Sequence, residues 1–81
     1  MTVSIYSSSH KCLITRLREG RLRCRMTQAQ AGQRLGYSRH WVSKIEAGQL
    51  KLDVLTFVQM CNVYQLSPAD LLTELGKELE G

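Results

Sequence analysis

Residues 27–48 read TQAQAGQRLGYSRHWVSKIEAG, and this stretch decides the fold. A threonine followed three positions later by a glutamine has the spacing of a capping box, so we expect a helix over residues 27–35 that ends at Gly36. Ser38 then caps a second helix over residues 39–47, which stops at a glycine in the position of a left-handed C-terminal cap. The pattern predicts two short helices joined by a tight turn.

Helical periodicity continues on both sides of this stretch. The serine cluster at residues 7–9 predicts the start of a helix that reaches about Arg23. Asp53 predicts the start of a helix to about Tyr64, and the run Ser67-Pro68-Ala69-Asp70 predicts a fifth helix. The helix that starts at the serine cluster is expected to carry Leu13, Ile14, Leu17 and Arg21 on one face, and the helix that starts at Asp53 an inward stripe of Val54, Phe57, Val58, Cys61 and Tyr64. The fifth helix is expected to carry an apolar stripe of Leu71, Leu72, Leu75 and Leu79, of which Leu71 and Leu72 could simply close the core. The sequence therefore predicts an all-α, compact five-helix domain.

The chain of 81 residues has room for one domain with a modest core. Residues 2–6 alternate polar and apolar side chains, so we expect a short N-terminal arm over residues 1–8, either flexible or a short strand. The domain itself is expected over residues 9–75, with residues 76–81 as the end of the last helix or a tail. Neither a secretory signal nor a long apolar run is visible, which predicts a cytoplasmic protein with no membrane contact.

The three cysteines are odd in number and lack C-x-x-C spacing. We therefore expect no disulfide framework, no metal site and no cofactor, and we expect Cys61 to be a small buried hydrophobe. Enzymatic activity is not expected either, because His10 and His40 lie on different elements and no acid pair or glycine-rich phosphate loop is present.

Charge divides the chain in two. Residues 1–51 carry ten of the eleven Lys and Arg residues against two acids, a net +8, while residues 52–81 carry one Lys against five acids, a net −4. A basic half suits a polyanion and leaves the acidic half for protein contacts, although ordinary solvated faces have the same composition.

The helix predicted over residues 39–47 has two distinct faces at about 100° per residue. One arc holds Trp41, Val42, Ile45 and Glu46, and the opposite arc holds Arg39, His40, Ser43, Lys44 and Ala47. The first arc is expected to be held by the core, so the second is offered to a partner. Because the major groove of B-DNA admits an α-helix, double-stranded DNA is the expected partner.

Donor chemistry suggests a role for each side chain. Arg39 is expected to hydrogen-bond O6 and N7 of guanine, while His40 and Lys44 read a neighbouring base or bind phosphate. Ser43 is expected to hold a phosphate oxygen. Gln28 places its amide and the first N–H groups of its helix near a phosphate.

Residues 26–61, MTQAQAGQRLGYSRHWVSKIEAGQLKLDVLTFVQMC, resemble the lambda-repressor/Cro-like, or XRE-type, helix-turn-helix family. The matching features are Thr27-Gln28, Leu35-Gly36, Ser38, Val42-Ser43, Ile45-Glu46 and Gly48. The resemblance implies a five-helix transcriptional regulator, a repressor that binds a palindromic operator as a dimer with the helix over residues 39–47 in the major groove.

The same resemblance implies a set of contacts. Its base-reading positions fall on Arg39, His40 and Lys44, and its backbone contacts fall on Gln28, Ser38, Ser43 and Lys51. It also implies a structural ion pair between Arg21 and Glu46.

Four positions depart from the family pattern. The family usually has a larger aliphatic residue at the position of Ala31 and an alanine at the position of Gly32. Trp41 stands where a small or polar residue is common, so it either fills the space left by Ala31 or contacts sugar and phosphate. Leu52 replaces a proline in the following loop.

Leu75 and Leu79 are hard to bury in so small a domain. We expect them, together with the N-terminal arm, to form a two-fold homodimer interface. The alternative is that the acidic C-terminal helix docks a partner protein such as a toxin, which would make the chain an antitoxin that also represses its own operon.

Overall fold

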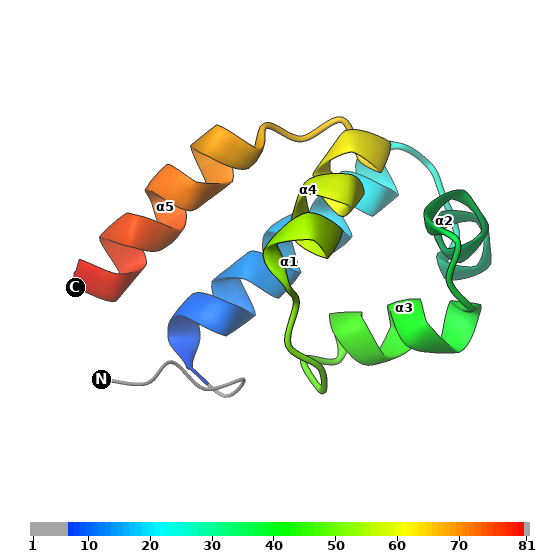
Figure 1. Cartoon of the computed structure of the whole chain (residues 1–81), viewed down its shortest axis with the longest axis horizontal. Helices are drawn as coiled ribbons and strands as arrows, with labels where there is room; N and C mark the ends of the chain where they lie inside the picture. Colours follow the sequence, from blue (N-terminus) through cyan, green and yellow to red (C-terminus); the bar gives the residue numbers. More distant parts are fainter. Residues whose placement is uncertain (1–6, 81) are drawn as a thin grey trace.

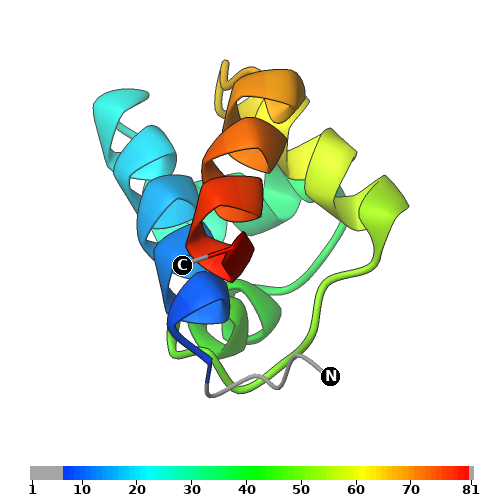
Figure 2. The same cartoon turned by 90° about the vertical axis from the view of Figure 1, so that its left-hand side faces the viewer.

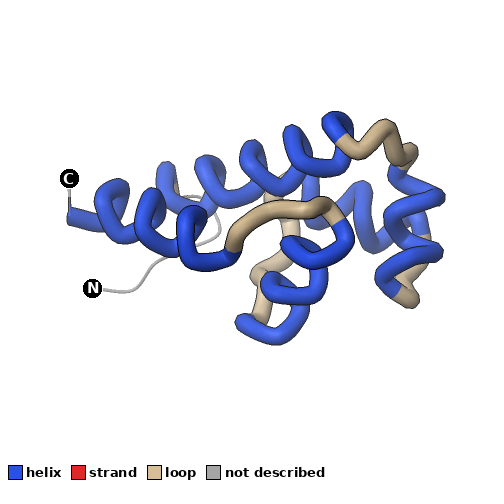
Figure 3. The backbone as a smooth tube through the Cα atoms, turned by 90° about the horizontal axis from the view of Figure 1, so that it is seen from above, coloured by secondary structure: helices blue, strands red, loops and turns tan. Residues whose placement is uncertain are grey.

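The computed structural model describes residues 7–80, which form five helices joined by short loops (Figure 1, Figure 3). In chain order they are α1 (Ser8–Arg23), α2 (Gln28–Leu35), α3 (Arg39–Glu46), α4 (Val54–Val63) and α5 (Pro68–Glu80). No strand occurs within residues 7–80, so the prediction of an all-α, five-helix fold is confirmed. The arm predicted over residues 1–8 lies almost wholly outside the described residues. The boundary expected after residue 75 falls inside α5.

All five helices begin at the caps predicted for them. At the start of α2 the capping box is complete, because the Thr27 hydroxyl accepts from the Gln30 N–H at 3.1 Å and the side-chain Oε1 of Gln30 accepts from the Thr27 N–H at 2.8 Å. The other caps are Ser7 for α1, Ser38 for α3, Asp53 for α4 and Ser67 for α5, each accepting from the N–H three residues further on. These bonds satisfy N–H groups for which the helix itself has no acceptor.

The helix ends are less uniform than the starts. Gly36 and Gly48 adopt the predicted left-handed conformation, with φ of 82° and 74°. Arg25 and Gln65 adopt it as well, with φ of 59° and 58°, just beyond the ends of α1 and α4. A side chain in this conformation costs roughly 1 to 2 kcal/mol. At both ends a late carbonyl group of the helix accepts from the chain that follows, Arg21 O from the Met26 N–H at 3.2 Å and Cys61 O from the Leu66 N–H at 2.8 Å, and these local bonds offset the cost. α3 and α4 each end one residue before the predicted position.

The helices are arranged around α1. α2 packs against α3 at one end of the molecule, and α5 lies along α1 toward the other end (Figure 1). Figure 2 shows α5 crossing in front of α1 and α4. The core between them consists of Ile14, Leu17, Ala31, Leu35, Val42, Ile45, Phe57, Met60, Cys61, Tyr64 and Leu71. Because every helix contributes to this core, α3 is fixed relative to the other four.

The predicted inward faces of α4 and α5 need correction. Val54 is 75% exposed, although it was expected in the core, and Met60 is fully buried in its stead. Val54 is the first residue of α4 and borders an open hollow, so most of its side chain stays uncovered. In α5, Leu71 closes the core while Leu72 stays 57% exposed. Cys61 is a buried free thiol, as predicted.

Gly32 permits a very close approach between α2 and the turn that follows it. A Cβ atom built on Gly32 would lie 2.8 Å from the Tyr37 carbonyl oxygen and 3.0 Å from the Ser38 carbonyl carbon. Both neighbours are backbone atoms that cannot rotate away. The glycine is therefore required by the tight turn and is not merely a loss of volume.

We expect Gly32→Ala to destabilise the protein by about 1 to 3 kcal/mol, because the turn must move to make room for the methyl group. Urea unfolding followed by circular dichroism measures this difference. The matched control is Gly76→Ala in α5, where nothing lies within 4 Å of the new Cβ. That variant should gain about 0.5 to 1 kcal/mol from helix propensity. Equal stability of Gly32→Ala and the parent protein would contradict the argument.

Candidate nucleic-acid interface

α3 turns its apolar face to the core and its polar face outward. Val42 and Ile45 are 0% and 1% exposed. Arg39, His40 and Ser43 are exposed, and Lys44, on the same arc, is half-buried. The division of α3 into two faces therefore agrees with the prediction from its periodicity, and a series of hydrogen-bond donors lies on its free side.

A buried carboxylate fixes the C-terminal end of α3. Glu46 accepts from Arg21 through two bonds, Nε to Oε2 at 2.6 Å and Nη2 to Oε1 at 2.8 Å, and both side chains are less than a tenth exposed. The third nitrogen of Arg21 donates to the carbonyl oxygen of Met26 at 2.8 Å. Bonding to Glu46 raises the pKa of Arg21. The ion pair implied by the family resemblance is thus confirmed, and it joins α1 to α3.

Gln28 also belongs to this cluster. Its Nε2 donates to Glu46 Oε1 at 3.2 Å, so the side chain that was expected to face a phosphate is engaged inside the protein. This bond links the first residue of α2 to the last residue of α3. Nearby, burial raises the pKa of Tyr64 to about 12, with a smaller contribution from the charge of Glu46. The carboxylate therefore influences groups from α1, α2 and α4.

Two short helices joined by a left-handed glycine turn, with the second presenting donors, match a known architecture. The family model described as Helix-turn-helix domain matches residues 13–75. The chain belongs to this family. Its members bind DNA, and the match covers α2, α3 and most of the remaining helices. No curated protein and no solved structure was found to match the chain.

Within the helix-turn-helix domain, Trp41 packs on two sides. It lies against the buried core while half-buried, which agrees with the packing alternative considered for it. Its indole also stacks on the ring of Tyr37, with centroids 4.0 Å apart and an interplanar angle of 10°. Sequence reasoning missed Tyr37. The i,i+4 spacing of two aromatic residues across the Ser38 cap is the signal that could have found it.

Lys51 is exposed in the loop between α3 and α4 of the helix-turn-helix domain. At the start of α1, burial lowers the pKa of His10, and the positive charge of Lys51 lowers it further. Lys51 thus lies on the side of the molecule where α1 begins and α3 ends.

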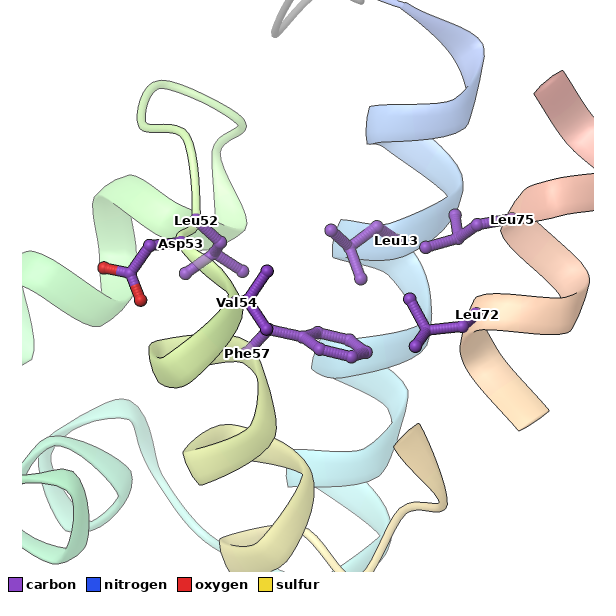
Figure 4. A pocket seen from close by; sticks show the side chains of 7 residues that line it. All are labelled: Leu13, Leu52, Asp53, Val54, Phe57, Leu72 and Leu75. Atoms are coloured by element: carbon purple, nitrogen blue, oxygen red, sulfur yellow. The ribbon is translucent and has the colours of Figure 1, made fainter. Parts of the chain in front are cut away.

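Leu75 and Leu79 lie far along the chain from these residues, on α5. Leu75 is half-buried and points into an apolar hollow of about 160 Å³ between α1, α4 and α5 (Figure 4). Leu13, Phe57 and Leu72 point into the same hollow, whereas the carboxylate of Asp53 points away from it. Leu79, 59% exposed, lines a neighbouring hollow that shares Leu13 and Leu75.

Within residues 7–80, no group of three His, Cys, Asp or Glu side chains is placed to hold a metal ion. None of the helices in that range is both long enough and apolar enough to cross a membrane.

We expect Glu46→Ala to cost about 3 to 5 kcal/mol of folding stability, because it leaves the buried Arg21 cation without its partner. Replacing both members by apolar residues, as in Arg21→Met with Glu46→Leu, should recover much of that loss. Urea midpoints of the three proteins test this order. Glu19→Gln, which breaks an exposed ion pair with Arg16, is the control and should leave the midpoint nearly unchanged. A double variant no more stable than Glu46→Ala would contradict the argument.

Proposed function

We propose that the chain is an XRE-type transcriptional regulator, a repressor that binds a palindromic DNA operator as a homodimer in the cytoplasm. The observation that carries this proposal is the exposed polar arc of α3, on a helix held from behind by Val42, Ile45 and Glu46. A helix of this kind fits the major groove, where its first residues meet base edges.

The proposed base contacts come from the first turns of α3. Arg39 presents a guanidinium fork that suits O6 and N7 of guanine. His40 and Lys44 lie one turn apart and reach a neighbouring base or a phosphate. All three are part of the exposed or half-exposed arc, so contact requires no rearrangement of the core.

The proposed backbone contacts surround this arc. The Ser38 hydroxyl accepts from the Trp41 N–H, and its own hydrogen is still able to bond a phosphate oxygen. Gln28 contributes the second hydrogen of its amide and its backbone N–H, since one amide hydrogen is taken by Glu46. Ser43 and Lys51 complete the set. Such contacts fix the register of α3 without reading sequence.

We expect Arg39→Ala to lose about 1 to 3 kcal/mol of binding free energy on the preferred operator and to relax preference at one base pair. Lys51→Ala should weaken all sequences alike and reduce the salt dependence by about one counterion. Selecting bound fragments from random duplex DNA identifies the operator, and titrations on selected and scrambled duplexes then measure both effects. Equal, sequence-independent losses from the two variants would remove Arg39 as a base reader. Binding that does not depend on salt would contradict the whole proposal.

The dimer part of the proposal rests on α5. Leu79 is exposed beside an apolar hollow that Leu13 and Leu75 share, and a second copy related by a two-fold axis would cover these side chains. Half-sites are then expected about one helical turn apart.

We expect Leu79→Glu to convert a micromolar dimer into a monomer, because it places two carboxylates in the proposed two-fold interface. Light scattering measures the mass, and Leu22→Glu, on a 50% exposed leucine of α1, is the matched control. A parent protein that stays monomeric at high micromolar concentration would exclude the dimer. The hollow would then be open to a partner protein, as in the antitoxin alternative.

A further inference from the structure

The stacked rings of Tyr37 and Trp41 have no role in the contacts described so far. Tyr37 lies in the turn between α2 and α3 and is 40% exposed. Trp41 is the third residue of α3 and is half-buried against the core. The Trp41 indole therefore lies between the core and the Tyr37 ring, and the Tyr37 phenol is exposed to solvent.

This stack holds the exposed Tyr37 side chain in a fixed place. Stacking on Trp41 restricts a ring that would otherwise turn freely in water. One face of the Tyr37 ring is covered by Trp41, so its other face, its edge and its hydroxyl remain for a ligand. An exposed aromatic ring fixed in this way is ready to bind without loss of side-chain entropy.

The neighbours of Tyr37 indicate what that ligand is. Ser38, Arg39 and His40 follow it directly and are all exposed, so the surface around the ring is polar and cationic. The most exposed large aliphatic side chains of residues 7–80 lie elsewhere, on α4 and α5. A polyanion suits this surface better than an apolar protein partner does.

We propose that Tyr37, supported by Trp41, contacts the sugar–phosphate backbone of DNA and sets the depth and register of α3. This inference rests on the proposed function. A residue just before the cap of the recognition helix lies at the lip of the major groove, where a strand backbone passes. There the Tyr37 hydroxyl donates to a phosphate oxygen and the free ring surface packs against deoxyribose. Trp41 acts through Tyr37 and is a positioning residue.

A neutral contact has a different signature from a cationic one. Tyr37 carries no charge that displaces a counterion, so its loss weakens binding without changing the salt dependence. Lys51→Ala, in contrast, is expected to lower that dependence. The two kinds of backbone contact are therefore separable by titration at several salt concentrations.

The test uses the full chain and a mixed-sequence duplex about two helical turns long. Tyr37→Phe should weaken binding about three- to tenfold through the lost hydrogen bond, and Tyr37→Ala should weaken it several-fold more. The slope of affinity against salt should stay that of the parent protein in both. Leu22→Ala, which removes an exposed apolar side chain near the end of α1, is the control and should bind as the parent does.

The only tryptophan in the chain is Trp41, so its fluorescence reports on this site directly. Saturating duplex should shield Trp41 from quenching by acrylamide, and Tyr37→Ala should remove much of that shielding. Circular dichroism confirms that the variants keep the fold.

Parent-like affinity of both Tyr37 variants would overturn the inference while leaving the proposed function intact. The inference would also be overturned if duplex DNA left the acrylamide quenching of Trp41 unchanged. The same holds if this quenching fell with protein concentration in the absence of DNA. A parent protein that binds no duplex at any salt concentration would overturn the proposed function and this inference together.

Discussion

The buried pair between Arg21 and Glu46 is the interaction on which the geometry of the domain depends. It joins α1 to α3, and Gln28 brings α2 to the same carboxylate. An apolar contact tolerates small sliding motions, whereas a bidentate ion pair in a dry environment accepts only one geometry. At its other end α3 is fixed by the Ser38 cap and by the close approach of the turn to Gly32. α3 is therefore positioned from both ends.

Features of the fold that depend on local chemistry could be predicted from the sequence. Hydroxyl and carboxylate caps, the Thr27 capping box and the left-handed Gly36 each act within a few residues, so their pattern is visible in the chain itself. Features that depend on which residues of other helices pack against an element could not be predicted. Val54 follows the periodicity of a buried residue, yet it borders an open hollow and is 75% exposed, while Phe57 in the same turn is buried. Arg25 shows the same limit, since nothing about an arginine marks it as the left-handed residue beyond the end of α1.

The candidate site divides in the same way. The two faces of α3 follow from helical period alone, and Arg39, His40 and Ser43 are exposed as that period predicts. Periodicity could not show that Gln28 reaches Glu46, because the two residues are brought together only when α2 folds back on α3. Nor could it show that the indole of Trp41 would stack on the ring of Tyr37. Membership of the helix-turn-helix family supports DNA binding, and the individual contacts remain proposals.

The fold places most of the acidic residues in one helix. Four of the seven acids belong to α5, at the opposite side of the molecule from α3 (Figure 1). Not all cations lie opposite α5, because Arg16 of α1 pairs with Glu74 of α5 at 2.8 Å. α3 nevertheless carries Arg39 and Lys44 against one paired acid, Glu46, whereas α5 carries four acids against Lys77, so the electric dipole moment has a component along the line from α5 to α3. In the field of a polyanion such a dipole experiences a torque that favours orientations with α3 toward the polyanion. Separation of charge thus acts before any contact forms, by raising the fraction of collisions that begin in a productive orientation.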